Sequence, residues 1–253
     1  MLNIDLNCDI GESTLLWPYS IDHDISLLQY VSSINIACGF HAGDPDTMQQ
    51  LITDAIPRNI SIGAHPSFPD RENFGRKEMD FDDKDLYRII YQQIEFIAEV
   101  ALSTGGRIKH VKPHGALYNM AAKDHRLSFI LCSAIQSYDE DLVIYGLSGS
   151  EIIKVADRMG LKSCSEVFAD RTYQNDGSLT PRSETNALIE DESQSLQQVL
   201  QMIIQGSVTS AKGEKIFLKA ETVCIHGDGK YALKFAKNIY ETLRQHGINI
   251  SHP

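Results

Sequence analysis

Short apolar runs rich in β-branched residues alternate along this chain with longer stretches whose apolar residues recur at helical spacing. This alternation predicts parallel strands joined by helical crossovers, in either an open sheet or a closed barrel. Seven strands are expected, at residues 3–8, 32–37, 60–64, 108–112, 142–146, 164–168 and 222–226. The expected helices lie near residues 45–55, 86–101, 124–137, 150–159, 192–206 and 230–246.

Most of these strands place polar residues on one face and apolar residues on the other. In the first strand, Asp5, Asn7 and Asp9 alternate with apolar side chains. Parallel strands that helices cover on both faces usually read as continuous apolar runs, so the alternation favours a barrel with a polar lumen over an open sheet. Isolated buried charges are costly, and we therefore expect Lys112 and Glu166 to be paired, or to lie near water or a ligand. The alternative is a buried polar network without chemistry.

The composition argues against several classes of protein. The 253 residues carry a formal net charge of −11, which disfavours binding to nucleic acid or to an anionic membrane. No apolar run approaches the roughly 20 residues that span a bilayer. The first residues do not read as a signal peptide, and the five cysteines form no CxxC pair, so a reduced, cytoplasmic protein is expected. No linker or repeat divides the chain, which predicts one (β/α) barrel domain over residues 1–253 with an irregular excursion near 170–192.

Charged and imidazole side chains gather where the expected strands end, which is where α/β barrels build their active sites. The carboxylates there, among them Glu12, could activate water as general bases. Lys112 and Arg171 could hold an anionic group. Asp9, His41 and His65 could form a metal site with mixed nitrogen and oxygen ligands. The alternative is a set of histidines that act by hydrogen bonding or by acid–base chemistry.

Other signatures of chemistry are weak or missing. The sequence contains no Gly-x-Gly-x-x-Gly, and residues 206–213 fail as a Walker A motif because they lack the second glycine and the hydroxyl after Lys212. Cys38 could act as a nucleophile with His41, although a small residue lining the core is the more usual role for such a cysteine.

Several long motifs resemble those of a known family. They read DLNCDIGE at residues 5–12, NIACGFHAGDP at 35–45, IGAHPSFPDR at 62–71 and HVKPHGALYN at 110–119. Shorter matches follow at residues 74–76, 166–171 and 226–228. In this order they resemble the LamB/YcsF family, and the resemblance covers almost the whole chain.

The resemblance implies a fold and an activity. The fold would be a seven-stranded (β/α) barrel of the glycoside hydrolase/deacetylase type. The activity would be the ATP-dependent opening of the 5-oxo-L-proline lactam to L-glutamate, with formation of ADP and phosphate. Two partner proteins, the 5-oxoprolinase B and C subunits, would complete the complex. ATP would be the cofactor of the complex, and a divalent metal is compatible with the same site.

Because an unactivated lactam is a poor electrophile, phosphorylation of its carbonyl oxygen would prepare it for attack by water. On this hypothesis the catalytic residues are Asp9, Glu12, His41, His65, Glu166 and His226. The residues expected to bind substrate are Asn7, Lys112, His114, Asp170 and Arg171. Two other functions stay open: a stand-alone metal-dependent amide or ester hydrolase of the deacetylase kind, and a non-catalytic subunit that only binds substrate.

Overall fold

Parallel strands close into a barrel at the centre of the molecule. The computed structural model describes residues 2–14, 16, 18, 20–226 and 232–253, and for residue 226 the backbone alone. Within them the barrel order is β1-β2-β3-β4-β5-β6-β9, and β9 pairs back onto β1 to close it. The strands are β1 (Asn3–Ile10), β2 (Ser33–Ala37), β3 (Ser61–His65), β4 (Ile108–Val111), β5 (Val143–Leu147), β6 (Ser163–Phe168) and β9 (Thr222–His226). The predicted seven-stranded (β/α) barrel is therefore confirmed, and each strand lies within two residues of its expected bounds.

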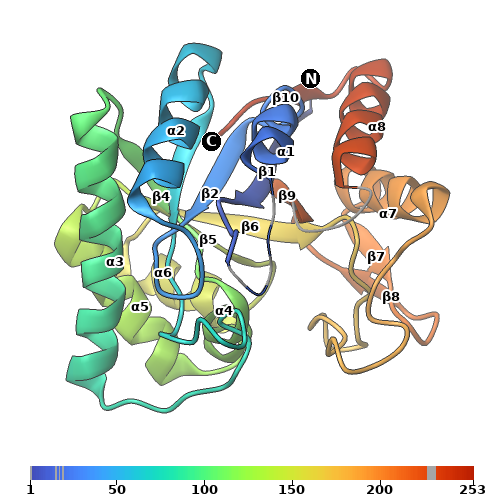
Figure 1. The fold of residues 1–253 in the computed structure, drawn as a ribbon. Helices are drawn as coiled ribbons and strands as arrows, with labels where there is room; N and C mark the ends of the chain where they lie inside the picture. Colours follow the sequence, from blue (N-terminus) through green and yellow to red (C-terminus); the bar gives the residue numbers. More distant parts are fainter. Residues whose placement is uncertain (1, 15, 17, 19, 227–231) are drawn as a thin grey trace.

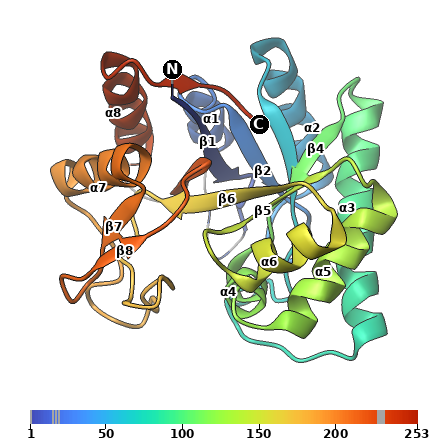
Figure 2. The same cartoon turned by 180° about the vertical axis from the view of Figure 1, so that it is seen from behind.

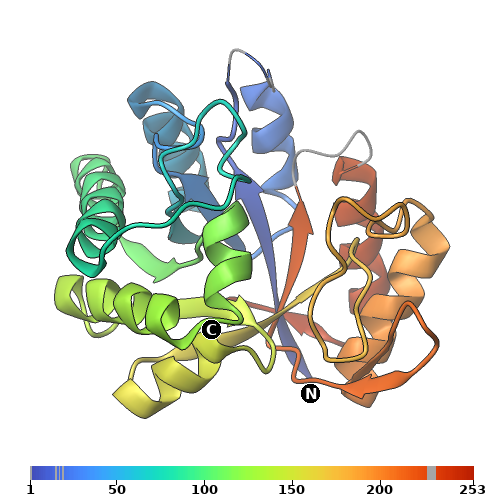
Figure 3. The same cartoon turned by 90° about the horizontal axis from the view of Figure 1, so that it is seen from below.

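Helices surround the strands, as the view along the barrel in Figure 3 shows. Those expected from the sequence are α2 (Pro45–Ala55), α3 (Asp83–Ser103), α5 (His125–Tyr138), α6 (Glu151–Met159), α7 (Glu192–Gln205) and α8 (Ala232–Gln245). Three further elements were not expected: α1 (Ile21–Leu27), the 3₁₀ turn Ile56–Arg58, and α4 (Gly115–Ala121). Each is too short to show an apolar repeat in the sequence. No helix in the described part of the chain is both long and apolar enough to cross a membrane.

Aspartates fix the starts of several crossover helices. Asp44, Asp82, Asp124 and Asp191 each stand at the N-cap, where the side chain accepts a hydrogen bond from the backbone N–H three residues later. Such a cap satisfies one of the amides that the first helical turn leaves without a partner. Local sequence therefore sets where these helices begin after the strand-end loops.

The segment between β6 and α7 leaves the barrel. It is irregular, with isolated bridges between Arg171 and Leu188 and between Tyr173 and Leu179. A hairpin follows α7, with strands β7 (Ser207–Thr209) and β8 (Lys215–Phe217), and it lies beside the irregular segment at one side of the barrel (Figures 1 and 2). The short β10 (Asn249–Ile250) pairs with the start of β1. These strands were not predicted, because two or three residues show no alternation.

The polar face of the strands points into the barrel, as predicted. Hydrogen bonds join strands that are not neighbours: Ser33 of β2 lies 3.3 Å from the Tyr145 hydroxyl of β5, and His110 of β4 lies 2.9 Å from the Asn35 side chain of β2. Both contacts must cross the lumen. The Asp5 carboxylate accepts hydrogen bonds from Ser32, Ser33, Thr222 and Tyr145. Burial of Asp5 nevertheless raises the pKa of its carboxyl group. This layer fills the inner lumen, below the carboxyl ends of the strands.

Candidate functional site at the carboxyl ends of the barrel strands

The turns that follow the strands bring one carboxylate and three imidazoles together. Glu12 follows Gly11, whose positive φ of +71° lets the chain turn sharply after β1, and the Gly11 amide donates to Asp24 at 2.8 Å. His65 is the last residue of β3. His114 is the N-cap of α4, and it is followed by Gly115 at φ +57°. His41 lies in the turn between β2 and α2.

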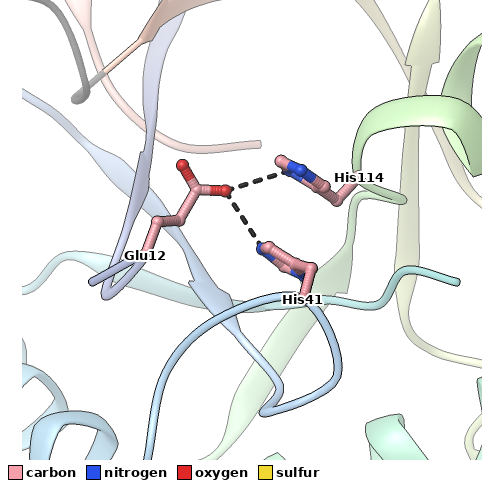
Figure 4. Close-up of side chains that lie close together, drawn as sticks. All are labelled: Glu12, His41 and His114. Carbon is pink, nitrogen blue, oxygen red and sulfur yellow. Dashed lines mark hydrogen bonds and ion pairs between the residues drawn. The ribbon is translucent and has the colours of Figure 1, made fainter. Parts of the chain in front are cut away.

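These four side chains meet around one oxygen of Glu12, and Figure 4 shows three of them, Glu12, His41 and His114. Glu12 Oε1 lies 3.1 Å from His41 Nε2, 3.0 Å from His114 Nδ1 and 3.6 Å from His65 Nε2. His65 Nε2 and His114 Nδ1 are 3.0 Å apart. The rings of His41 and His114 stack at a centroid distance of 3.8 Å. We call Glu12, His41, His65 and His114 the histidine cluster.

Fixed partners orient the outer nitrogen of each ring. His65 Nδ1 lies 2.7 Å from the Lys112 carbonyl, and His114 Nε2 lies 2.9 Å from the Phe74 carbonyl. Because a carbonyl only accepts, each of these nitrogens must carry the proton. His41 Nδ1 faces Ser67 Oγ at 2.8 Å, and this hydroxyl donates to the Phe68 carbonyl, so His41 Nδ1 also donates. When a ring is neutral, its inner nitrogen therefore carries a lone pair and can only accept a hydrogen bond.

Burial keeps at least two of these rings neutral. Desolvation, aided by the neighbouring imidazoles, lowers the pKa of His41 to about 3 and that of His65 to about 4. Burial alone would raise the pKa of Glu12, but contact with His114 and His41 outweighs it and holds the pKa of Glu12 well below its ordinary value. Glu12 is therefore an ionised carboxylate beside the neutral ring of His41. Glu12, His41 and His114 offer ligand atoms within 4.8 Å of one another, a spacing that fits a metal ion.

A second group of charges adjoins the histidine cluster and is centred on Lys112. The Lys112 ammonium lies 2.9 Å from Asp9 Oδ1 and 2.7 Å from Glu166 Oε1. Tyr118 donates its hydroxyl proton to Glu166 Oε2 at 2.7 Å. Burial would lower the pKa of Lys112, but the carboxylates beside it raise the pKa well above its ordinary value, so the ammonium stays charged. Burial raises the pKa of Glu166. Lys112 and Glu166 are thus both paired, which is one of the outcomes expected from the sequence.

The two groups touch and share one cavity. His65 Nε2 lies 3.6 Å from Asp9 Oδ2, which joins the histidine cluster to the Lys112 group. The cavity has a volume of about 910 Å³, in the range of small-molecule sites. Asp9, Glu12, His65, Lys112 and His114 form part of its wall. The remainder includes Tyr118, the start of α6 and the irregular segment at residues 176–183.

The structure brings together eight of the eleven residues singled out from the sequence: Asn7, Asp9, Glu12, His41, His65, Lys112, His114 and Glu166. The carboxylate between the imidazoles is Glu12, whereas Asp9 pairs with Lys112, so the metal set expected from Asp9, His41 and His65 is not the one that this geometry favours. Their catalytic and substrate-binding roles stay predictions.

The other three residues are placed differently. Arg171 lines the cavity, but its guanidinium donates to the Ala187 and Thr180 carbonyls and so holds the irregular segment in place. Asp170 accepts from the Ile189 amide through its own carbonyl. His226 ends β9 in register with Asp9. The His226 side chain lies outside the described residues, as do Gly227 and Asp228.

Sequence reasoning missed Tyr118 and Ser67. Tyr118 stands four residues after His114, a spacing that places both on one face of a helix. The seven-residue helix α4 was not expected, so this signal went unused. Ser67 is held by Gln93 of α3, whose side chain contacts both the amide and the carbonyl of Ser67 at 2.9 Å. No local pattern in the sequence joins residues so far apart.

Comparisons with known proteins place this site in a family context. The LamB/YcsF family model matches residues 4–253. A protein of Bordetella parapertussis, named as the A subunit of 5-oxoprolinase, is 50% identical, with 98% of this chain and 97% of that protein covered. The crystal structure of a lactam utilization protein from Thermus thermophilus superposes with a TM-score of 0.91 at 34% identity, over 99% of both chains. The catalytic domain of a peptidoglycan N-acetylglucosamine deacetylase from Eubacterium rectale shares the fold alone, with a TM-score of 0.52 and 12% identity over 99% of this chain and 87% of that one.

Proposed function

The chain belongs to the LamB/YcsF family, and from this premise we propose that it is the first of the three components, A, B and C, of an ATP-dependent 5-oxoprolinase. The complex would open the lactam of 5-oxo-L-proline to L-glutamate, with ATP converted to ADP and phosphate. The observation that carries this proposal is the near full-length match, at 50% identity, to the Bordetella protein that bears the name of the 5-oxoprolinase A component. The polar cavity at the strand ends supports it, because a scaffold protein needs no convergent buried charges.

We infer the partners from the same name. A protein named as one component of an enzyme implies others, and we propose that the 5-oxoprolinase B and C subunits complete the activity. We assign ATP to the complex as a whole rather than to this chain. All five cysteines are buried and form no disulfide, which supports a location in the reducing cytoplasm.

The proposed reaction places three demands on the site. Water must lose a proton as it adds to the lactam carbonyl carbon. The carbonyl oxygen must be stabilised as negative charge develops on it. If this oxygen carries the phosphoryl group, C–N cleavage leaves a glutamyl phosphate, which a second water must hydrolyse to glutamate and phosphate. The ring nitrogen must gain a proton as the C–N bond breaks, which leaves the amino group of glutamate.

We assign the proton transfers to His65. Its Nδ1–H is fixed on the Lys112 carbonyl, so the Nε2 lone pair on the cavity wall is the atom that can take a proton. The proton removed from water would pass through His65 Nε2 to the ring nitrogen. The low pKa of about 4 keeps His65 neutral before the reaction and makes its imidazolium a strong proton donor afterwards.

We assign stabilisation of the developing negative charge to Lys112. Its ammonium lines the cavity and stays protonated between Asp9 and Glu166. Asp9, Glu166 and Tyr118 then position this ammonium. The carboxylate of the substrate, or its phosphoryl group, could be met by the exposed cations of the cavity wall, Arg76, Lys123, Lys154 and Arg182.

One observation favours a second candidate, a stand-alone metal-dependent amide or ester hydrolase. The grouping of Glu12, His41 and His114 fits a metal ion, and such an ion can activate water without ATP. Hydrolysis of simple amides or acetylated sugars by the chain alone, abolished by a chelator, would favour this candidate. A component that only binds substrate would instead tolerate loss of His65 and Lys112 without loss of turnover.

The experiment that tests the proposed function is reconstitution. Glutamate is measured after 5-oxoproline is mixed with this chain, with the B and C subunits, or with all of them, each with and without ATP. We expect glutamate only from the complete mixture with ATP. Glutamate formation by the B and C subunits without this chain, or no glutamate from the complete mixture, would contradict the proposal.

A further inference from the structure

We propose that Glu12, His41 and His114 bind one divalent transition-metal ion, with His65 beside the position left open for water or substrate. Binding of the ion does not depend on which substrate the cavity takes, so it goes beyond the proposed lactam chemistry.

When the rings are neutral, the cluster has more acceptor atoms than donors. The outer nitrogens of His41 and His114 are held as donors by Ser67 and by the Phe74 carbonyl. In the neutral rings, their inner nitrogens face Glu12 Oε1 as acceptors, at 3.1 Å and 3.0 Å. Acceptors this close repel one another unless a cation lies among them. A single extra proton can bridge one pair, whereas a metal ion satisfies all three atoms together.

The spacing and the outer contacts also suit a metal. With ligand bonds of about 2.0–2.1 Å, a tetrahedral ion holds its ligand atoms roughly 3.3–3.4 Å apart. The distances from Glu12 Oε1 to the two imidazole nitrogens, 3.1 Å and 3.0 Å, lie within a few tenths of an ångström of that spacing. Because the two rings stack in parallel, one of them must turn on metal binding for both lone pairs to point at the ion. Metal-binding imidazoles almost always donate their other N–H to a fixed oxygen, as His41 and His114 do.

The balance of charge in the site also favours a bound cation. Among the described side chains in direct contact, the site holds the carboxylates of Asp9, Glu12 and Glu166 against one ammonium, that of Lys112. If Glu166 is protonated, Asp9 and Glu12 still leave an excess of negative charge. Buried charge of this kind is costly unless it is compensated, and a divalent cation would compensate it.

The ligand types select the ion. Two imidazoles and one carboxylate suit Zn²⁺, Co²⁺, Ni²⁺ or Fe²⁺, whereas Mg²⁺ prefers oxygen ligands and retains water. The Mg²⁺ that accompanies ATP is therefore not expected at this site. A bound ion with three protein ligands would act as a Lewis acid toward an oxygen in the open position. Glu12 and His114 line the cavity, so that position is accessible from it.

The test is metal binding by the chain alone, which needs no substrate and no partner protein. The protein is stripped with a chelator and titrated with Zn²⁺ by calorimetry and with Co²⁺ by absorption spectroscopy. We expect one ion per chain, with the visible Co²⁺ bands of a low-coordinate nitrogen and oxygen site. We expect Glu12→Gln and His114→Gln to weaken binding by roughly 100-fold or more. His246→Gln, which removes an exposed imidazole just after α8, should bind as the wild type does.

A measurement on the unaltered chain guards against variants that fail to fold. Zn²⁺ should raise the Tm of the stripped wild-type protein, because an ion that binds only the folded state stabilises it, and Mg²⁺ at the same concentration should not. Absence of stoichiometric binding by the wild type would overturn the proposal and leave a shared proton as the cation of the cluster. So would folded Glu12→Gln and His114→Gln variants that retain wild-type affinity.

Discussion

Gly63 of β3 leaves room for the imidazole of His110 in the lumen, and the substitution Gly63→Ala tests this packing. An added Cβ at Gly63 would lie 2.1 Å from His110 Nε2 and 2.3 Å from Cδ2. The ring cannot swing away freely, because Ser61 and Asn35 hold its two nitrogens at 3.1 Å and 2.9 Å and Tyr145 stacks on it at 4.3 Å. The alanine must therefore displace a buried, fully hydrogen-bonded side chain.

The expected loss of stability follows from the hydrogen bonds and the packing that this displacement disrupts. Two buried hydrogen bonds contribute about 1 kcal/mol each, and overpacking a core costs about 1–3 kcal/mol. We expect Gly63→Ala to lower the free energy of unfolding by about 3–5 kcal/mol, a large share of the roughly 5–15 kcal/mol that stabilises a typical domain.

Urea denaturation at neutral pH measures the loss. Gly106→Ala is the matched control, because its Cβ would meet only the flexible side-chain ends of Ile56, at 3.1 Å, and Ile62, at 3.4 Å. His110→Ala should relieve the clash, so the double variant Gly63→Ala/His110→Ala should be more stable than the sum of the single effects predicts, by about 1–3 kcal/mol. Equal losses for Gly63→Ala and Gly106→Ala, or strict additivity in the double variant, would refute this account of the lumen.

Two further predictions concern protonation and the site loops. Burial lowers the pKa of His110 to about 3, so between pH 6.5 and pH 4 the unfolded chain binds a proton there that the folded chain does not. As the pH is lowered through this range, the free energy of unfolding of the wild type should decrease by about 1.4 kcal/mol per pH unit more than that of His110→Gln. Equal pH dependence of the urea midpoint in the two proteins would contradict this. Gly115→Ala would place a Cβ 2.4 Å from the Gly75 carbonyl and displace His114, so it should impair Co²⁺ binding and glutamate formation. Gly160→Ala is its control, since Gly160 shares a positive φ (+73°) but has open space, and equal loss in both variants would count against the positioning role.

Much of the barrel could be predicted because its signals are local. Every barrel strand is a short run with at least one β-branched residue. The alternation of Asp5, Asn7 and Asp9 with apolar residues indicated a polar lumen, which the cross-lumen contacts confirm. The carboxyl ends of parallel strands meet at one rim. For that reason the acids and histidines after separate strands could be expected to converge before any distance was known.

The parts that were missed depend on contacts between distant segments. Whether Arg171 faces the cavity or braces the irregular segment depends on carbonyls at Thr180 and Ala187, which no strand pattern positions. Glu12 rather than Asp9 lies among the imidazoles because the chain turns at Gly11, and the sequence alone does not give the direction of that turn. The hairpin β7–β8 has three-residue strands, too short for alternation to be visible.

The central claim is that the strand-end residues carry out lactam opening in a 5-oxoprolinase complex, and His65→Gln tests it most directly. Glutamine can keep the hydrogen bond to the Lys112 carbonyl but cannot carry the proton between water and the ring nitrogen. In the assembled complex with ATP, we expect kcat for glutamate formation to fall by roughly 10²–10⁴-fold, with Co²⁺ binding retained and His246→Gln unchanged in both respects. Wild-type turnover by His65→Gln would contradict the claim and move the chemistry elsewhere.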